Sequence, residues 1–198
     1  QLLLAEKDGP LTPKQRQRIE QIMSSSDQVN SLLSDLSDVK KLDRNDLKLN
    51  LEETDTAILL NKIAVNVKDL IESRGAVLEV KIKKSTTISC DPARISQVII
   101  NIVKNAIDFN PKNNGRITIS SDVTDVGQTL ISIEDNGIGI PEKYHEKVFK
   151  VFQVLEESED TTGVGLSIVK KVVDFYNGDI WLDSAIGEGT TFYFTLPK

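Results

Sequence analysis

The spacing of apolar residues changes near residue 46, and this change divides the chain into two parts. In the first part, residues separated by alternating steps of three and four form one line: Ile19, Ile22, Ser26, Val29, Leu33 and Leu36. Such a line, interrupted once by a serine, is typical of a helix in a coiled coil or four-helix bundle. An ordinary core-facing helix is the alternative, but no second full-length helix nearby could cover it. We therefore expect an intermolecular bundle.

After residue 46, strand and helix periods are mixed. Strands are expected at 47–51, 77–82, 86–89, 116–123, 130–134, 180–183 and 191–196. One helix should begin at Thr54 or Asp55 and stop at Gly75, with Leu59, Ile63, Val67 and Leu70 facing inward. Further helices are expected from Asp91-Pro92 to about Phe109 and from Gly165 to about Tyr176. Strands and helices are mixed along this part, and its last strands are expected to be antiparallel, which predicts an α+β fold.

Composition excludes several classes of function. The net charge of −6 argues against a nucleic-acid-binding surface, which would be basic. The single cysteine, Cys90, rules out an internal disulfide framework, and the single histidine, His145, argues against a Ser-His-Asp triad. No apolar run approaches the roughly 18 residues that a membrane span needs.

Three glycine-rich segments stand out: DNGIGIP (135–141), TTGVGLSIV (161–169) and GEGTTF (187–192). The second leads directly into a helix, whose first N–H groups can hold an anion. It lacks the Gly-Lys-Ser/Thr of a P-loop, and it does not follow the first strand of a Rossmann unit. Taken alone, these glycines could also serve only as turns.

A fourth segment, NIVKNAIDFNP (101–111), favours a binding site. Asn101 and Asn105 are four residues apart on one expected helix and so share a face. Two amides on such a face need partners if they are buried. Amide oxygens also suit Mg²⁺, which takes a few protein oxygens together with water and phosphate.

These four segments, together with VFKVF (148–152), resemble the ATP-binding catalytic domain of two-component sensor histidine kinases. The resemblance covers about residues 47–198, and the wider superfamily includes type II topoisomerases, heat-shock chaperones and mismatch-repair ATPases. It implies a Bergerat-type fold, a two-layer α/β sandwich with a mixed, largely antiparallel sheet and helices on one face. Residues 1–46 resemble part of the dimerisation and phosphotransfer helical hairpin.

The resemblance also implies roles for individual residues. Asp135 would accept a hydrogen bond from the adenine amine, and Thr190 would hold a water beside it. Asn105 would ligate Mg²⁺ with Asn101 nearby, and Phe109 would flank the nucleotide. The remaining cofactor-binding residues would line the base and the phosphates: Asp108, Gly137, Gly139, Ile140, Gly163, Gly165 and Leu166. Phe149 and Phe152 would pin a mobile lid over residues 153–162.

Three departures from the family pattern concern the phosphates. Asp108 stands where the family usually has a basic residue, and Thr161 replaces the first glycine of the second glycine-rich segment. Val154 replaces a common lid arginine, and the acidic residues that follow have no basic neighbour: Glu156, Glu157, Glu159 and Asp160. We expect weak triphosphate binding or a strong dependence on Mg²⁺.

The phosphate-accepting histidine of the family would lie upstream of Gln1, so this chain would be a fragment without it. His145 is then expected to be a surface histidine, and Cys90 a small buried residue. The resemblance implies that this kinase core is cytoplasmic and forms a homodimer through the bundle. It also implies a response-regulator receiver domain as partner. We expect this fragment to contact neither nucleic acid nor a membrane.

Three alternatives remain open. An ATP-hydrolysing clamp would need a water-activating Glu where Asn101 stands. A nucleotide-sensing module could have lost catalysis, as the acidic lid suggests. A serine-kinase anti-sigma factor would share the glycine-rich and asparagine segments but would not need the N-terminal helix of the expected bundle.

Overall fold

The computed structural model describes residues 10–19, 21–23, 25–26, 29, 33, 37, 49–110, 114–150 and 163–197. Every described position between 13 and 37 is helical, as the spacing predicts. From residue 52 the order is β1 (Glu52–Asp55), α2 (Thr56–Ser73), β2 (Val77–Ile82), β3 (Thr87–Cys90), α3 (Pro92–Asp108), β4 (Arg116–Val123), β5 (Thr129–Asp135), the 3₁₀ turn η1 (Glu142–Tyr144), α4 (Gly165–Phe175), β6 (Ile180–Ala185) and β7 (Gly189–Leu196).

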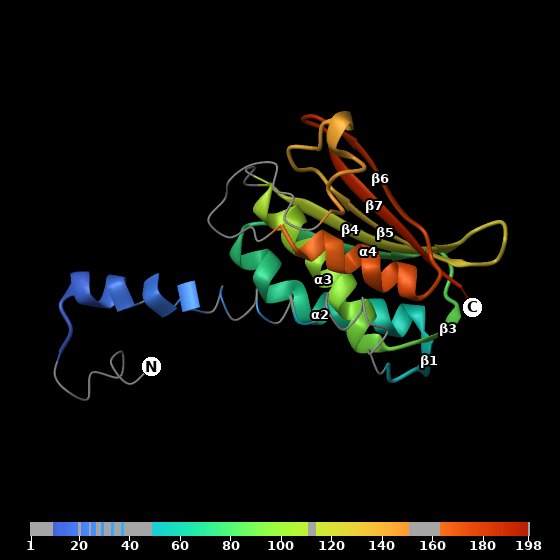
Figure 1. Cartoon of the computed structure of the whole chain (residues 1–198), viewed down its shortest axis with the longest axis horizontal. Helices are drawn as coiled ribbons and strands as arrows, with labels where there is room; N and C mark the ends of the chain where they lie inside the picture. Colours follow the sequence, from blue (N-terminus) through green and yellow to red (C-terminus); the bar gives the residue numbers. More distant parts are fainter. Residues whose placement is uncertain are drawn as a thin grey trace.

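In the described part of the chain, a five-stranded sheet has the order β2-β4-β5-β7-β6. Only the β2–β4 pair in it is parallel, and the other neighbours are antiparallel. Helices α2, α3 and α4 lie together on one side of this sheet (Figure 1). The expected two-layer α+β sandwich with a mixed, largely antiparallel sheet is confirmed.

The core lies between the helices and the inner face of the sheet. Alternate residues of β4, β5 and β7 point into it and are almost completely buried: Ile117, Ile119, Ile131, Ile133, Phe192 and Phe194. Such alternation places one face of each strand against the helices and leaves the other face outward. Helix α3 packs against both α2 and α4, and so lies in the middle of the helical layer.

Aspartates begin two of the helices. The Asp55 carboxylate accepts hydrogen bonds from the Ile58 N–H and the Ser85 hydroxyl, both at 3.0 Å, and these bonds lower the pKa of Asp55. Asp91 caps α3 by accepting from the N–H groups of its first turn. The Asp91 N–H also donates to the Tyr176 hydroxyl at 2.9 Å, which ties the start of α3 to the end of α4.

Two expectations about these elements are wrong. Residues 49–51 are not in a strand; the strand begins at Glu52, because residues 52–55 are the ones that pair with β3 in a separate two-stranded sheet. Leu70 is 38% exposed, and Ile71 is buried in its place. At 100° per residue, the position one turn after buried Val67 is residue 71, so the inward line continues there.

The described part of the N-terminal apolar line is exposed except at Ile19, which is half-buried. Ile22, Val29 and Leu33 are 68%, 54% and 62% exposed, whereas Leu36 and the expected domain boundary at 46/47 lie outside the described residues. None of the helices in the described ranges has the length and apolar character that crossing a membrane requires.

Candidate functional site

Three polar residues stand side by side across neighbouring strands at one end of the sheet. Asp135 ends β5 and is opposite Thr190 of β7, which in turn is opposite Ser184 of β6. Residues directly opposite on antiparallel strands point to the same face. Thr190 is buried and Asp135 half-buried, so this row faces the helical layer rather than the outer side of the sheet. The expected neighbourhood of Asp135 and Thr190 is present.

The first glycine segment turns tightly over this row. Asp135 Oδ1 accepts the N–H of Gly137 at 2.8 Å, and the N–H of Ile138 donates to the Phe109 carbonyl at 3.1 Å. A Cβ on Gly137 would stand 2.8 Å from that same carbonyl oxygen. The end of α3 therefore holds the first segment directly, and Gly137 is required because the two backbones touch.

The third glycine segment is fastened to the first one. Gly187 N–H donates to the Ile138 carbonyl at 2.7 Å. Gly139 and Gly189 have φ values of +75° and +115°. A Cβ on Gly139 would overlap the backbone of Ala185 at the end of β6, and a Cβ on Gly189 would overlap the backbone of Asp135 in the first segment. Both positions therefore accept only glycine, and the turn formed by the two segments has little room to rearrange.

The first amide of the α3 pair, Asn101, contacts the second glycine segment. Asn101 Nδ2 donates to the Gly165 carbonyl at 3.3 Å, and Asn105 lies half-buried one turn further along α3. Gly165 is the first residue of α4, Gly163 precedes it with a φ of +67°, and Leu166 packs against the core. Asn101 is therefore in contact with the start of α4.

The start of α4 offers hydrogen-bond donors. Its N-cap residue is Val164, which makes no side-chain cap hydrogen bond, and the first N–H groups of a helix have no partner within the helix itself. The described residues also contain no group of three or more His, Cys, Asp or Glu side chains that could hold a metal ion. An anion at this helix start is the ligand that the donors fit.

Asp108 is the last residue of α3. Its Oδ1 is 3.8 Å from Arg74 Nη1, just beyond the end of α2. The pair is partly exposed, and its contribution to stability is accordingly small. Arg74 offsets part of the negative charge that sequence reasoning placed near the phosphates.

Two residues that sequence reasoning missed hold the site together. Asn136 Oδ1 accepts from Asn110 Nδ2 at 2.8 Å and from the Arg116 N–H at 2.7 Å, while its Nδ2 donates to the Asn114 carbonyl at 3.2 Å. It thereby joins the first glycine segment to the loop that follows α3. The second missed residue, Ser184, has no sequence signal because a serine in a strand is unremarkable.

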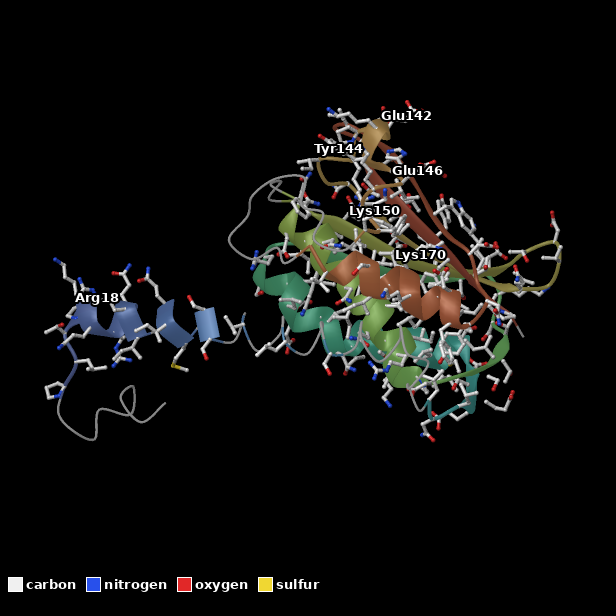
Figure 2. The ribbon with its side chains drawn as sticks, in the orientation of Figure 1. Arg18, Glu142, Tyr144, Glu146, Lys150 and Lys170 are labelled. Atoms are coloured by element: carbon white, nitrogen blue, oxygen red, sulfur yellow. The ribbon has the colours of Figure 1, made fainter. Side chains whose placement is uncertain are left out.

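The segment after the first glycine box packs over β6 and β7. Figure 2 shows Glu142, Tyr144 and Glu146 together at this end of the molecule, whereas Lys170 lies on α4. His145, expected at the surface, is partly exposed, and its Nε2 donates to the Ile140 carbonyl at 2.9 Å. Phe149 packs edge-to-face on Phe192, with ring centroids 6.2 Å apart. Phe152 and the expected lid lie outside the described residues.

Comparisons with known proteins agree with this geometry. Residues 90–198 match the family described as histidine kinase-, DNA gyrase B- and HSP90-like ATPases. The chain is 35% identical over 171 residues to the sensor histidine kinase WalK of Bacillus subtilis, covering 84% of this chain and 28% of WalK. The chain spans between 21% and 49% of the length of the curated relatives it matches.

Solved structures show the same fold. The Acinetobacter baumannii histidine kinase AdeS superimposes with a TM-score of 0.78 at 26% identity, covering 98% of this chain and 90% of that one. Histidine kinase ThkA in complex with the response regulator TrrA gives a TM-score of 0.70 at 26% identity, covering 100% of this chain and 55% of that one. The chain belongs to the histidine kinase, gyrase B and HSP90-like ATPase family, and its relatives include sensor histidine kinases.

Proposed function

We propose that this chain is the ATP-binding core of a two-component sensor histidine kinase. In this proposal it holds Mg²⁺·ATP so that the γ-phosphoryl group passes to a histidine upstream of Gln1 and then to a response-regulator aspartate. Such a core works in the cytoplasm, where ATP is available. The observation that carries the proposal is the convergence of three glycine segments on Asp135 and on the start of α4.

The two ends of the site suit the two ends of ATP. Asp135 and Thr190 present oxygens, which fit the exocyclic amine of adenine and would face the carbonyl of guanine unfavourably. The α4 start presents N–H groups and the positive end of the helix dipole, which fit phosphate oxygens. In this arrangement Phe109, Gly137, Gly139 and Ile140 surround the base, and Gly163, Gly165 and Leu166 surround the phosphates.

Asn105 is the residue that we propose as a Mg²⁺ ligand, with Asn101 beside it. An amide oxygen binds Mg²⁺ without the charge of a carboxylate, and phosphate oxygens and water complete an octahedral shell. The ion would offset the negative charge of the phosphates. The protein itself offsets this charge weakly, because acidic Asp108 stands where the family usually has a basic residue. Loss of Mg²⁺ should therefore reduce triphosphate binding more than adenosine binding.

Phosphoryl transfer depends chiefly on placing the acceptor in line with the γ-phosphate. The exposed line through Ile22, Val29 and Leu33 supports a bundle that brings a second copy and the acceptor helix to the nucleotide. We propose a homodimer on this basis. The complex of ThkA with TrrA supports a receiver domain as the partner that accepts the phosphoryl group in turn.

An ATP-hydrolysing clamp is the second candidate, because the family includes gyrase B-like ATPases. Asn101 argues against it. Its Nδ2 is already engaged with the Gly165 carbonyl, and an amide cannot take a proton from water at neutral pH. A degenerate nucleotide-sensing module differs from the kinase only in lacking transfer.

Calorimetry with a non-hydrolysable ATP analogue tests the base contact. Asp135→Ala should weaken binding by about 1–3 kcal/mol, roughly 5- to 150-fold, since the adenine amine loses its acceptor. Asp135→Asn is the matched control for the loop, because its remaining oxygen can still accept the Gly137 N–H. Unchanged affinity in a folded Asp135→Ala protein would remove Asp135 from the site.

Radiolabelling separates the three functions. Residues 1–198 incubated with γ-labelled ATP and Mg²⁺ should bind nucleotide but form no acid-labile phosphate, because the acceptor lies upstream. Adding the upstream helix, in the same chain or as a dimerising fragment, should produce label on a histidine of that helix. Label on His145 would contradict the kinase proposal, and rapid hydrolysis without phosphoprotein would favour the clamp.

A further inference from the structure

An aromatic pair lies on the outer face of the sheet, on the side that the helices do not cover. Trp181 of β6 is directly opposite Tyr193 of β7, and their rings stack with centroids 5.3 Å apart and planes 11° from parallel. Their strand neighbours Leu182 and Phe192 are buried in the core, so the two rings point outward. Trp181 is 38% exposed, and α2, α3 and α4 lie on the other side of the sheet (Figure 1). Part of the indole therefore faces solvent.

The indole of Trp181 has one ring face without a neighbouring strand. β6 is the last strand of the sheet, so Tyr193 covers the indole from one side and no strand lies on the other. The two described lysines that lie over an aromatic ring, Lys143 and Lys147, both lie over Tyr144. No cation of the described residues occupies the open face of Trp181. Such an electron-rich face attracts a positive charge.

The strands around the aromatic pair carry carboxylates without counter-charges. Asp183 follows Trp181 by two residues and so shares its face of β6. Glu134 of β5 is opposite Thr191, which is opposite Asp183. Both carboxylates are exposed, and within the described ranges neither has an ion-pair partner. Strands β5, β6 and β7 contain no lysine or arginine, so this end of the outer face is negative.

The opposite edge of the same sheet is balanced in charge. Lys81 of β2 lies 3.0 Å from the Glu79 carboxylate, and Lys83 lies 3.8 Å from the Asp122 carboxylate of β4. The chain thus supplies its own cations for the carboxylates near β2 and none for those near β6. A cation from outside the described residues fits the β6 side.

A guanidinium group fits the ring and the carboxylate at once. It is planar, so it can stack on the open face of Trp181 while its N–H edge bonds the Asp183 carboxylate. Residues on one face of a strand repeat at about 6.6 Å, which brings both groups within reach of one arginine. A quaternary ammonium needs several rings arranged as a cage, whereas these two rings stack on each other. A lysine ammonium has no plane to stack.

We infer that this end of the outer face binds an arginine-bearing segment of a partner protein. The inference does not rest on the proposed function, because Asp135 and Thr190 face the helical layer on the other side of the sheet. One exposed stacking contact and one exposed ion pair are each weak, so a single free arginine binds poorly. A segment that offers a second arginine to Glu134 binds more tightly.

The probe for this test is the peptide Gly-Arg-Pro-Pro-Arg-Gly. Asp183 and Glu134 are two strand spacings apart, roughly 9.6 Å. A polyproline helix repeats every three residues with a rise of roughly 9.3 Å, so its two arginines point to the same side at a matching distance. The control peptides replace both arginines by lysine or by glutamate.

Trp181 is the single tryptophan of the chain, so its fluorescence reports directly on the proposed site. The arginine peptide should change this emission in a saturable way. The lysine peptide should bind roughly threefold more weakly or worse, because it cannot stack and bond the carboxylate together. The glutamate peptide should not bind.

Matched variants, followed by the NMR amide shifts of β6 and β7, locate the contact. Asp183→Asn should weaken binding of the arginine peptide roughly three- to tenfold. Asp69→Asn removes another exposed carboxylate, on α2, and should keep the wild-type affinity. Trp181→Leu removes the ring and should weaken binding by a similar factor. If that variant does not fold, Trp181→Phe keeps a weaker ring face and should give a smaller loss.

Several results would overturn the inference. They are the absence of saturable binding in wild type, equal affinity for the arginine and lysine peptides, and equal effects of Asp183→Asn and Asp69→Asn. Amide shifts in β6 that depend on protein concentration without peptide would show that a second copy covers this face instead. Competition between the peptide and an ATP analogue would place the peptide at the nucleotide site and would likewise refute an outer-face contact.

Discussion

The amide of Asn136 is the point at which the fold and the proposed nucleotide site are most closely joined. Asn136→Ala removes two acceptor contacts, to Asn110 and to the Arg116 N–H, and one donor contact to the Asn114 carbonyl. Since Asn136 lies between Asp135 and Gly137, its loss releases the first glycine segment from the loop after α3. Stability and nucleotide affinity should both decrease.

The magnitude follows from the three bonds and their exposure. A net value of about 0.5–1.5 kcal/mol each gives an upper range of roughly 1.5–4.5 kcal/mol. Arg116 and Asn114 are exposed, so water replaces part of what is lost there. We expect the free energy of unfolding to fall by about 1–3 kcal/mol, or by roughly 2–12 °C in the melting temperature.

Urea unfolding measures this loss, with Asn136→Asp as the matched control. Aspartate keeps an acceptor for Asn110 and Arg116 but loses the donor to Asn114, so its loss should be intermediate. Asn110→Ala shares one bond with Asn136→Ala, and the double variant should be about 1 kcal/mol less destabilised than the sum. A decrease below about 0.5 kcal/mol in Asn136→Ala, or full additivity with Asn110→Ala, would refute this account of the loop.

Three other predictions concern charge and burial. Asp108→Lys should tighten ATP binding by about 1 kcal/mol and leave adenosine binding unchanged, because only phosphates respond to the charge; equal responses in calorimetry would place Asp108 away from them. The lowered pKa of Asp55 stabilises the fold above its unfolded pKa, so below about pH 4 wild type should lose stability more steeply than Asp55→Asn in acid titrations of unfolding. Burial raises the pKa of the Cys90 thiol, so thiol reagents should modify it only on unfolding; rapid labelling of the native protein would contradict its 1% exposure.

Much of the fold could be predicted from the sequence because its signals are local. The α3 start at Asp91-Pro92 combines a capping carboxylate with a proline at the first helical position, and the structure has both. The β2 and β4 bounds also agree with the alternating pattern. The alternating pattern predicted a strand at 47–51, but the strand that forms is β1, because its position is determined by pairing with the distant strand β3.

The residues of the candidate site also divide into those that the sequence predicts and those that only the structure identifies. Asp135 and Thr190 stand in recognisable segments, and the sheet register brings them together as expected. Ser184 and Asn136 act through partners that are distant in the sequence, such as Ile140 and Asn110. Asn136 stands in the first glycine segment, but the sequence does not indicate its partners, and Ser184 lies outside every glycine segment, so the register and the hydrogen bonds identify their roles.

The single parallel pair, β2 with β4, has a consequence for how the protein folds. β4 and β5 are joined by a turn of a few residues, in which Gly127 N–H donates to Thr124, so their pairing is local and can form early. β2 can join β4 only after β3 and the whole of α3 have been laid across the sheet. Its amide hydrogens should therefore gain protection from solvent exchange later during refolding than those of the β4–β5 hairpin.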